Sequence, residues 1–363
     1  MLNREILVIG AGPAGLSAAI EAASAGARVL LVDENSKPGG QLFKQIHKFF
    51  GSRDHRAGVR GINIGTELLA EAERLQIEVW LNAEVCGIFN GRDVWIVRDK
   101  ERSVTVRAER VIIATGAVEN AVNFPGWTLP GVMGAGAAQT MINLHRVLPG
   151  KKVLMIGSGN VGVIVSYQLL QAGADVKAVV EAAPRLGGYG VHTAKVRRAG
   201  VPFHSSHTVL RAEGNGRVEK AVIAQIDSRW QPVPGTEQEL DVDTICIAAG
   251  LTPLVELAFA CGCEKIYNPV LGGMIPWHDE RMGTSLPSIY IAGDISGVEE
   301  ASTAMEEGRM AGLSAAASLG HLSEEAYRER RLVIDGRLLA LRSGLFGQKR
   351  RDAKKMIISR GRD

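Results

Sequence analysis

A glycine-rich segment near the start of the chain constrains its fold more than any other feature. It has the sequence Gly-Ala-Gly-Pro-Ala-Gly at 10–15, and it lies between an apolar run at 4–9 and an alanine-rich stretch at 16–26. A second apolar run, 28–32, ends at Asp33. The order strand, glycine turn, helix, strand, acid is the fingerprint of a βαβ unit that binds a dinucleotide. We therefore expect an α/β chain that begins with a Rossmann-like parallel sheet.

Each glycine of this segment has a separate physical reason. Gly10 allows the tight turn after the strand, Gly12 lets the backbone approach a pyrophosphate, and Gly15 lets the helix pack on the sheet. Backbone N–H groups at the helix start, with the helix dipole behind them, then hold the phosphates. Asp33 can accept hydrogen bonds from both ribose hydroxyls. The residues expected at this first nucleotide site are Gly10, Gly12, Pro13, Ala14, Gly15, Asp33 and Glu34.

The same pattern recurs later in the chain. An apolar run at 151–156 leads into Gly-Ser-Gly-Asn-Val-Gly at 157–162, and another run, 176–180, ends at Glu181. Two complete fingerprints predict two dinucleotides that face each other across a cleft and exchange electrons. The alternative is a vestigial second domain that no longer binds reactive nicotinamide. The residues expected at the second site are Gly157, Gly159, Asn160, Val161, Gly162 and Glu181, with Gly250 at a later turn.

The acid of the second pattern bears on which nucleotide binds there. A carboxylate at Glu181 repels a 2′-phosphate and so favours NAD(H) over NADP(H). Arg185 lies only four residues further on, where it could attract such a phosphate. We expect a moderate preference for NAD(H).

Composition excludes several classes of protein. The 363 residues carry 42 basic and 39 acidic side chains, and a net charge of +3 is too balanced for a nucleic-acid-binding protein. Aromatic residues make up only 5%, which argues against a stacking platform for single-stranded nucleic acid. No stretch reaches the ~20 apolar residues of a transmembrane helix. Glycines interrupt the N-terminal apolar run, which argues against a signal peptide.

The cysteines indicate a reducing compartment. They are too few and too scattered for a disulfide framework or an iron–sulfur site: Cys86, Cys246, Cys261 and Cys263. We therefore expect a cytoplasmic protein. His204 and His207 have no third ligand nearby in the sequence, so we expect no metal site.

Basic residues are concentrated at the end of the chain. Only Asp352 and Asp363 oppose the following cluster: Lys349, Arg350, Arg351, Lys354, Lys355, Arg360 and Arg362. One interpretation of such a block is a solvated, frayed terminus. The other is a docking arm for an acidic partner protein.

Further motifs carry a resemblance to a known family. They are Gly-Gly-Gln at 39–41, Ala-Thr-Gly at 114–116 and Ala-Gly-Asp at 292–294, which occur in order around the two glycine fingerprints. Over about residues 1–320 the chain resembles the two-dinucleotide-domain flavoproteins that include thioredoxin reductase. The resemblance implies two Rossmann-like domains, each with a parallel sheet flanked by helices and a β-meander. It also implies FAD at the first site and NAD(P)H at the second.

The resemblance assigns roles and domain boundaries. Asp294 is expected to bind the ribityl chain, and a helix starting near Ala301 to point its N-terminus at the flavin pyrimidine. The residues expected along the cofactor are Gly40, Gln41, Thr115, Gly116, Gly293, Asp294, Ala301 and Ser302. The expected domains are 1–119 plus 251–330 for FAD, an inserted NAD domain at 120–250, and a basic tail at 331–363.

The chain departs from the disulfide reductases of that family. No cysteine occurs in the segment at 134–140 or in the segment after Gly-Gly-Gln, where these enzymes carry a redox pair. The spacing of Cys261 and Cys263 does not fit such a pair. We therefore do not expect disulfide reduction.

A closer similarity is to the FAD-containing α-type subunits of multi-subunit amino-acid dehydrogenases. These include sarcosine oxidase, opine oxidase, dye-linked proline dehydrogenase and hydrogen cyanide synthase, and the segments that carry the similarity are 39–52, 124–143 and 293–313. The similarity implies a hetero-oligomer in which a second FAD subunit oxidises the amine. It also implies that an FMN at the subunit interface, or a separate small [2Fe-2S] ferredoxin-like subunit, can relay electrons. Lys44, His47 and Lys48 are candidates for a phosphate, FMN or partner contact, or for a solvated helix face.

The expected function is an FAD-dependent oxidoreductase that exchanges electrons with NAD(H) as the relay subunit of such a complex. No side chain is assigned as catalytic, because hydride passes directly between the two rings and the protein mainly positions them. One alternative is a stand-alone NADH-dependent flavin reductase or oxidase that acts on a quinone, a dye or oxygen. The other is a structural subunit that holds nucleotides without catalysis.

Overall fold

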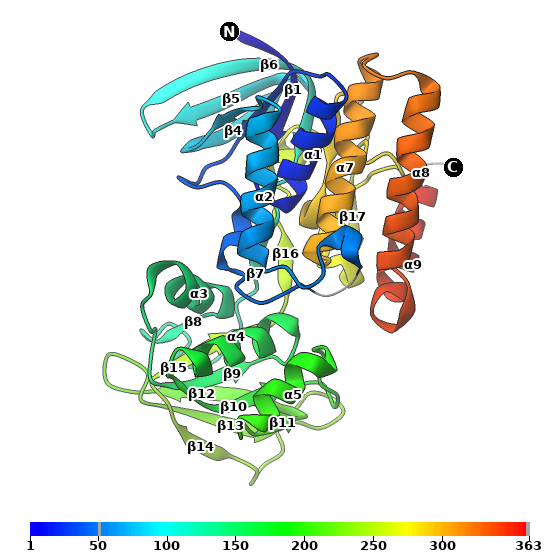
Figure 1. Cartoon of the computed structure of the whole chain (residues 1–363). Coiled ribbons are helices and arrows are strands. Elements are labelled where there is room, and N and C mark those ends of the chain that lie inside the picture. The colour runs from blue at the N-terminus through cyan, green and yellow to red at the C-terminus, as the bar shows by residue number, and fades with distance from the viewer. Residues whose placement is uncertain (50–51, 361–363) are drawn as a thin grey trace. The chain divides into compact units, whose positions relative to one another are not determined.

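The computed structural model of the chain describes residues 1–49 and 52–360. The chain divides into two units, Met1–Val118 with Thr252–Asp363 (unit 1) and Glu119–Leu251 (unit 2), which are coloured along the chain in Figure 1. Five residues of the segments singled out from the sequence lie outside the described residues: Phe50, Gly51, Gly361, Arg362 and Asp363.

Unit 1 contains a seven-stranded sheet in the order β3-β2-β1-β6-β5-β4, with β19 also paired to β6. Its parallel strands are β1 (Leu2–Ile9), β2 (Val29–Val32), β3 (Glu78–Trp80), β6 (Arg102–Ile113) and β19 (Ile289–Ile291). The meander adds β4 (Ala83–Phe89) and β5 (Asp93–Arg98), antiparallel to each other and to β6. Asn90 and Asp99 at the two hairpin turns both have positive φ, a conformation that Asn and Asp adopt more readily than most other residues.

The register of the parallel strands brings their carboxyl ends to one edge. Ile9 is opposite both Val32 and Ile113, and Ile113 is opposite Ile291. The residue after each of these strands therefore starts a loop at the same edge of the sheet. Ligands of open α/β sheets bind at this edge.

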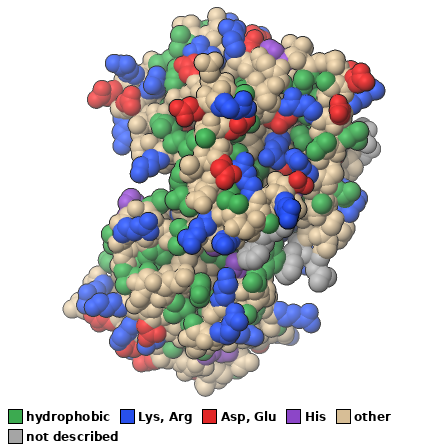
Figure 2. All heavy atoms as spheres, viewed as in Figure 1, with side chains coloured by type: hydrophobic (Ala, Val, Ile, Leu, Met, Phe, Trp, Pro, Cys, Tyr) green, Lys and Arg blue, Asp and Glu red, His purple; other side chains and the backbone are tan. Residues whose placement is uncertain are grey.

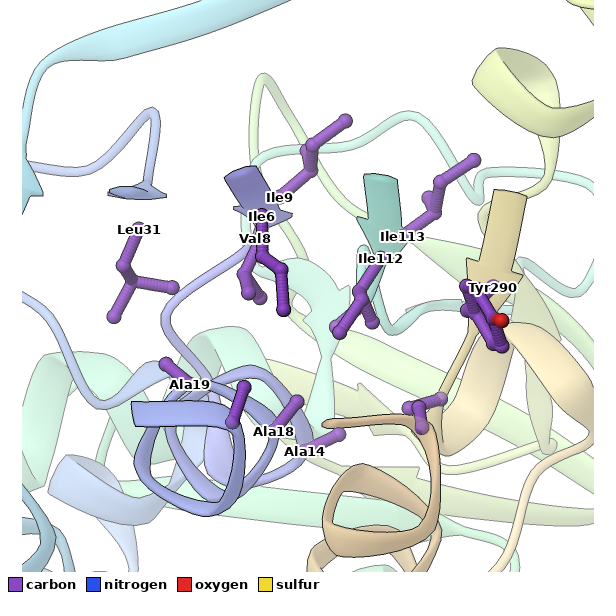
Figure 3. Close-up of a cluster of buried hydrophobic side chains, with 14 of the residues drawn as sticks. Ile6, Val8, Ile9, Ala14, Ala18, Ala19, Leu31, Ile112, Ile113 and Tyr290 are labelled. Carbon is purple, nitrogen blue, oxygen red and sulfur yellow. The ribbon is translucent and has the colours of Figure 1, made fainter. Parts of the chain in front are cut away.

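Helices cover the sheet of unit 1. Helix α1 (Pro13–Ser24) packs on the sheet beside α7 (Ala301–Ser318), and Figure 3 shows Ala14, Ala18 and Ala19 of α1 directed toward the apolar side chains of β1 and β6. The short side chains of α1 allow this close packing. The remaining helices of the unit are α2 (Gly61–Arg74), α6 (Glu256–Ala260), α8 (Glu324–Leu341) and α9 (Gly344–Arg360).

The described part of the expected tail, 331–360, is largely helical, in contrast to the solvated, frayed end that the basic block from Lys349 onward suggested. It contains the second half of α8 and the whole of α9, and Figure 1 shows α8 beside α7. Ala353 and Ile357 of α9 are buried against an apolar cluster that includes Leu271. Their i, i+4 spacing gives the helix one apolar stripe within a mostly basic sequence, and this stripe docks α9 on unit 1. Lys354, beside the stripe, is buried as well.

Unit 2 repeats the architecture. Its parallel sheet has the order β11-β10-β9-β15-β8, with helices and a meander of β12, β13 and β14. The strands and helices are β8 (Val132–Gly134), α3 (Ala135–Thr140), β9 (Lys152–Ile156), α4 (Asn160–Gln171), β10 (Asp175–Glu181), α5 (Gly190–Arg198), β11 (Phe203–Ser205), β12 (His207–Glu213), β13 (Lys220–Gln225), β14 (Gln238–Asp241) and β15 (Thr244–Ile247). The predicted fold class, two Rossmann-like units that each combine a parallel sheet with a meander, is confirmed.

Two small two-stranded sheets complete the structure. They are formed by β7 (Ala117–Glu119) with β16 (Leu251–Pro253) and by β17 (Lys265–Asn268) with β18 (Gly273–Pro276). On the face shown in Figure 2, basic side chains are interspersed with acidic and apolar ones. Within the described part of the chain, no helix combines the length and the apolar character needed to cross a membrane.

Candidate functional site

The first glycine turn lies at the carboxyl edge of the unit 1 sheet, between β1 and α1. Gly10 has φ +98°, and a Cβ atom placed on it would lie 2.3 Å from the carbonyl oxygen of Ala114. A Cβ atom on Gly15 would lie 1.7 Å from the carbonyl oxygen of Gly10. Both positions therefore exclude any side chain, for the reasons that the sequence predicted: a tight turn and close helix packing.

Gly12 has a different environment. A Cβ atom placed there would meet no atom within 4 Å, and its φ of −75° is open to any residue. Helix α1 begins at the next residue, Pro13, without a side-chain cap. The N–H groups of Ala14 and Gly15 lie in the first turn, where a helix supplies no acceptor of its own. An open backbone face beside such donors fits a pyrophosphate.

Asp33 is fixed against this turn. The residue is 7% exposed, and its Oδ2 accepts a hydrogen bond of 2.6 Å from Ala11 N. Oδ1 accepts hydrogen bonds from the backbone and side-chain nitrogens of Asn35, both at 2.8 Å. Because each carboxylate oxygen can accept two hydrogen bonds, Oδ2 keeps one position for a ligand hydroxyl. Glu34, the next residue, is exposed.

The Gly-Gly-Gln segment lies over the same turn. Gly39 N donates to Ala11 O at 2.7 Å, and a Cβ atom on Gly40 would lie 2.9 Å from Gly12 Cα. Gln41 follows in an exposed position, within the 3-10 turn Gly40–Lys44. Lys44 ends this short turn, and the chain that follows it through His47 and Lys48 is not helical. The interpretation of Lys44, His47 and Lys48 as one solvated helix face is therefore wrong.

The segment after β19 also reaches the turn. A Cβ atom on Gly293 would lie 2.7 Å from Ala14 Cβ, so this part of the Ala-Gly-Asp motif contacts the first turn of α1. Asp294 follows it, and burial raises the pKa of its carboxyl group to about 7, with the nearby Glu307 and Glu299 contributing in the same direction. A hydrogen bond from Glu299 N acts against this rise.

Helix α7 starts a few residues after Asp294. Its first residues are Ala301, which is partly buried, and Ser302, which is buried. In the loop that follows β6, Thr115 Oγ1 donates to Leu254 O at 2.6 Å, and Gly116 has φ +79°. The site residues predicted for unit 1 thus follow its parallel strands at the carboxyl edge or begin the helices α1 and α7 that come after them.

The second glycine turn repeats the geometry of the first in unit 2. Gly157 has φ +97°, and its Cβ atom would lie 2.3 Å from Ala248 O. A Cβ atom on Gly162 would lie 2.1 Å from Gly157 O and clash with it, whereas a Cβ atom on Gly159 would meet no atom within 4 Å. Helix α4 begins at Asn160, followed by Val161, so its first-turn N–H groups are placed as in α1.

Glu181 occupies the place of Asp33 in this second turn. Oε2 accepts hydrogen bonds from Ser158 N at 2.9 Å and Ser158 Oγ at 2.5 Å, and Oε1 accepts one from Ala183 N at 2.9 Å. Arg185 is exposed. Gly250, which has φ +96°, follows β15 and accepts a hydrogen bond from Asn120 N through its carbonyl oxygen.

Sequence reasoning missed a second parallel between the units. Gly187, Gly188 and Tyr189 follow Glu181 at the same spacing at which Gly-Gly-Gln at 39–41 follows its own acid. Gly187 N donates to Ser158 Oγ at 3.0 Å, and Tyr189 N donates to Asn160 Oδ1 at 2.9 Å, so this loop covers the second turn. An alignment of the two halves of the chain would have revealed it.

The four cysteines do not lie together in one site. Cys246 is buried in unit 2 and Cys86 is exposed in unit 1. Cys261 and Cys263 follow α6, with their Sγ atoms 3.9 Å apart. Among the described residues, no group of three or more His, Cys, Asp or Glu side chains is arranged to hold a metal ion.

The family model for pyridine nucleotide-disulphide oxidoreductases matches residues 4–308, which include both glycine turns. The chain belongs to this family. Membership supports an oxidoreductase that binds FAD and a nicotinamide nucleotide.

Two curated relatives in the family are components of larger enzymes. An opine oxidase subunit from Agrobacterium tumefaciens (strain Ach5) is 32% identical over 88% of this chain and 67% of its own length. Hydrogen cyanide synthase subunit HcnB from Pseudomonas aeruginosa is 29% identical over 99% of this chain and 81% of its own length. The chain thus spans about two thirds of the opine oxidase relative. These sequence identities confirm the predicted similarity to subunits of amino-acid-oxidising complexes.

The fold has relatives among solved structures. L-proline dehydrogenase from P. horikoshii superposes with a TM-score of 0.70 at 23% identity, over 93% of this chain and 58% of that one. This likeness concerns the fold.

Proposed function

We propose that the chain is an FAD-dependent oxidoreductase that exchanges electrons with NAD(H) and relays them within an amine- or amino-acid-oxidising complex. The observation that carries the proposal is the pair of glycine turns. Each has a ligand-facing glycine with open space, Gly12 or Gly159, at the start of a helix, with a buried or half-buried acid beside it. These are the requirements for holding a pyrophosphate and a ribose.

FAD is assigned to unit 1. The N–H groups of Ala14 and Gly15 would hold its pyrophosphate, and Asp33 Oδ2 would accept from a ribose hydroxyl. Asp294 would bind the ribityl chain, because its turn lies against the first turn of α1. Bound FAD would supply the ring that takes up and gives back a pair of electrons. The N-terminus of α7 at Ala301 and Ser302 would stabilise negative charge on that ring.

NAD(H) is assigned to unit 2. The first turn of α4 would hold the pyrophosphate, and Glu181 Oε1 keeps one acceptor position for a ribose hydroxyl. The negative charge of Glu181 supports NAD(H) over NADP(H). Tyr189 and the loop that carries it would border the nucleotide, because Tyr189 N is bound to the side chain of the first residue of α4.

The relay role rests on the relatives. The opine oxidase and hydrogen cyanide synthase proteins are named as subunits, and the similarity supports a hetero-oligomer with a second, FAD-containing dehydrogenase subunit. An FMN at the interface between subunits and a small [2Fe-2S] ferredoxin-like subunit remain parts of this proposal. Disulfide reduction is not proposed, because segments 39–49 and 134–140 contain no cysteine.

The test uses the purified protein with any partner that co-purifies. We expect a yellow protein whose visible flavin absorbance is bleached by NADH under anaerobic conditions and restored by an electron acceptor. A colourless preparation that takes up no FAD would refute the flavin assignment.

The same titration separates the alternatives. Rapid NADH turnover with a quinone, dye or oxygen by the isolated chain would favour a stand-alone reductase or oxidase. A flavin that NADH does not reduce, in a stable complex with a partner, would favour a structural subunit. Bleaching by an amino acid only when the partner is present would support the relay role.

A further inference from the structure

A cluster of buried charges lies in unit 1 next to the proposed flavin site. Its centre is Glu307 on α7, whose side chain is 2% exposed. Lys354 on α9 donates to Glu307 Oε1 at 2.8 Å, and Arg342, which follows α8, donates to the same oxygen. Arg342 also pairs with Glu299 at 2.6 Å. Two carboxylates and two cations therefore balance one another in the cluster.

The second oxygen of Glu307 binds the turn that precedes α7. Oε2 accepts hydrogen bonds from Gly293 N at 3.1 Å and from Ser296 Oγ at 2.7 Å. These residues flank Asp294, the proposed ribityl contact. The Glu307 carboxylate thus connects the turn to Lys354, which lies 47 positions after Glu307 in the sequence.

Lys354 also binds the turn directly. Its Nζ atom lies 2.8 Å from Ser296 O and 2.6 Å from Ser296 Oγ. With Glu307 Oε1 these are three acceptors, which equals the number of hydrogens on an ammonium group. His278 Nε2 is a more distant neighbour at 3.4 Å, and burial together with Lys354 lowers the pKa of His278 to about 3, so this imidazole is neutral.

Stability alone does not account for such a cluster. Removing charged groups from water is unfavourable, and well-packed apolar side chains in place of a buried ion pair are often as stable or more stable. A network of this kind does fix geometry, because each of its hydrogen bonds is directional and each unmade one leaves a buried charge unpaired. The geometry fixed here is that of the 293–296 turn.

We propose that Lys354 is a positioning residue for the flavin site. By holding Glu307 and Ser296 it fixes the 293–296 turn, and through the turn it fixes Asp294. Arg342 acts at the other end of the same segment, since it binds Glu299, whose N–H donates to Asp294 Oδ1. The segment that its basic sequence suggested to be a tail thus completes the support of the cofactor site. The proposal rests on the assignment of FAD to unit 1.

The test compares Lys354→Met with Lys355→Met in the full-length chain. Lys355 is exposed on the same helix and is the matched control. We expect Lys354→Met to weaken FAD binding at least tenfold, measured by the fluorescence of released flavin, and to shift the flavin reduction potential. Lys355→Met should change neither. Equal FAD affinity and equal potential in Lys354→Met and the wild type would overturn the proposal.

A double variant separates positioning from stability. Lys354→Met alone leaves the Glu307 charge poorly compensated, and the protein could fail to fold. Glu307→Gln combined with Lys354→Met removes both charges and keeps an acceptor for the turn, so the melting temperature should return toward that of the wild type. FAD affinity and potential that remain altered in the double variant support positioning, and their full recovery would show that Lys354 only neutralises Glu307.

The wild type distinguishes a failure of the FAD assignment from a failure of the role of Lys354. A wild-type protein that binds no FAD would refute the assigned function and with it this proposal. A wild type that binds FAD, with variants that bind it equally well, would refute only the role of Lys354.

Discussion

The parallel sheets of the two units have the same order of five strands, but the fifth strand comes from different parts of the chain. In unit 1 the order β3-β2-β1-β6 is extended by β19, which follows the rest of the unit's sheet in the sequence. In unit 2 the order β11-β10-β9-β15 is extended by β8, which precedes the rest of that sheet. The glycine turn between β1 and α1 and the one between β9 and α4 are alike to within a few tenths of an ångström in the contacts that exclude a Cβ atom.

The two fifth strands lead to different chemistry. After β8 the chain enters the short helix α3, where Glu119 Oε1 accepts a hydrogen bond of 2.6 Å from Gly136 N. The N-terminus of α3 is thus already bound by a carboxylate of unit 2, that of Glu119. After β19 the chain enters the turn with Asp294 and then α7, supported by Glu307. The glycine turns are the proposed pyrophosphate-binding segments of both units, and the residues after the fifth strand add the further flavin contacts proposed for unit 1.

The largest expected effect tests the shared geometry. Gly15→Ala and Gly162→Ala should each lower the free energy of unfolding by about 3 kcal/mol, because each added methyl group would meet a backbone oxygen that cannot move without opening the turn. Urea denaturation measures this. Gly12→Ala is the control and should change stability by less than about 1 kcal/mol. Equal destabilisation by Gly12→Ala and Gly15→Ala would contradict the contacts described for the turn.

The next effect separates the two ligands. Gly12→Ala and Gly159→Ala place a methyl group in open space, so both should fold normally. We expect Gly12→Ala to weaken FAD binding about tenfold or more and leave NADH affinity unchanged, and Gly159→Ala to do the reverse. Titration of each nucleotide into the flavin-free and flavin-loaded proteins measures the difference. If one variant weakened both nucleotides equally, the assignment of one ligand to each unit would fail.

A smaller effect concerns the acid of the second turn. Glu181→Gln should lower the ratio of the NADPH to the NADH dissociation constant about tenfold, or ~1.4 kcal/mol, because it removes a negative charge near the 2′ position. Arg185→Ala should raise the same ratio. An unchanged ratio in both variants would indicate that the nucleotide does not contact this part of unit 2.

A further effect is a pH dependence at Asp294. Burial raises the pKa of this carboxyl group to about 7 in the folded protein, compared with an unfolded value near 3.8. The folded state therefore holds a proton that the unfolded state lacks between about pH 4 and pH 7, and Asp294 makes stability fall as pH rises through this window.

Asp294→Asn should remove that part of the pH dependence. In the flavin-free protein, the melting temperature of the variant relative to the wild type should increase from pH 4 to pH 8 by about 2 °C or more. Thermal unfolding of both proteins across the pH range provides the measurement. A constant difference between the two proteins would show that Asp294 titrates normally in the absence of the cofactor.

The features that depend on local geometry could be predicted from the sequence. Gly10, Gly12 and Gly15 could be assigned separate roles because the strand, the turn and the helix are consecutive, and the contacts at Gly10 and Gly15 confirm the tight turn and the close helix packing. The hairpin turn at Asn90 and Gly91 is equally local, because an Asn-Gly pair favours a two-residue turn. Asp294 could be located through its motif, although the contact of the preceding residue, Gly293, with α1 depends on β19, which is far from α1 in the sequence.

The support of Asp294 could not be predicted in this way. Glu307 lies in a helix where acids are usually solvated, and Lys354 lies in a block of charges whose apolar stripe is only two residues wide. The burial of Glu307 and the burial of Lys354 explain each other, because burying either charge without the other would be strongly unfavourable. A pairing between positions so far apart leaves no periodic trace in a single sequence.

The contact between α1 and α7 has a consequence for the length of the ligand. Cβ atoms on Gly308 and Gly312 of α7 would lie 2.1 Å from Ala14 O and 2.2 Å from Ala18 O, so the two helices touch backbone to backbone and cannot slide past each other. If α1 binds a pyrophosphate and α7 faces a flavin ring, the spacing between these two ends is invariant. A full dinucleotide can reach both ends at once. A mononucleotide reaches only one, so unit 1 should select its cofactor by size as well as by charge.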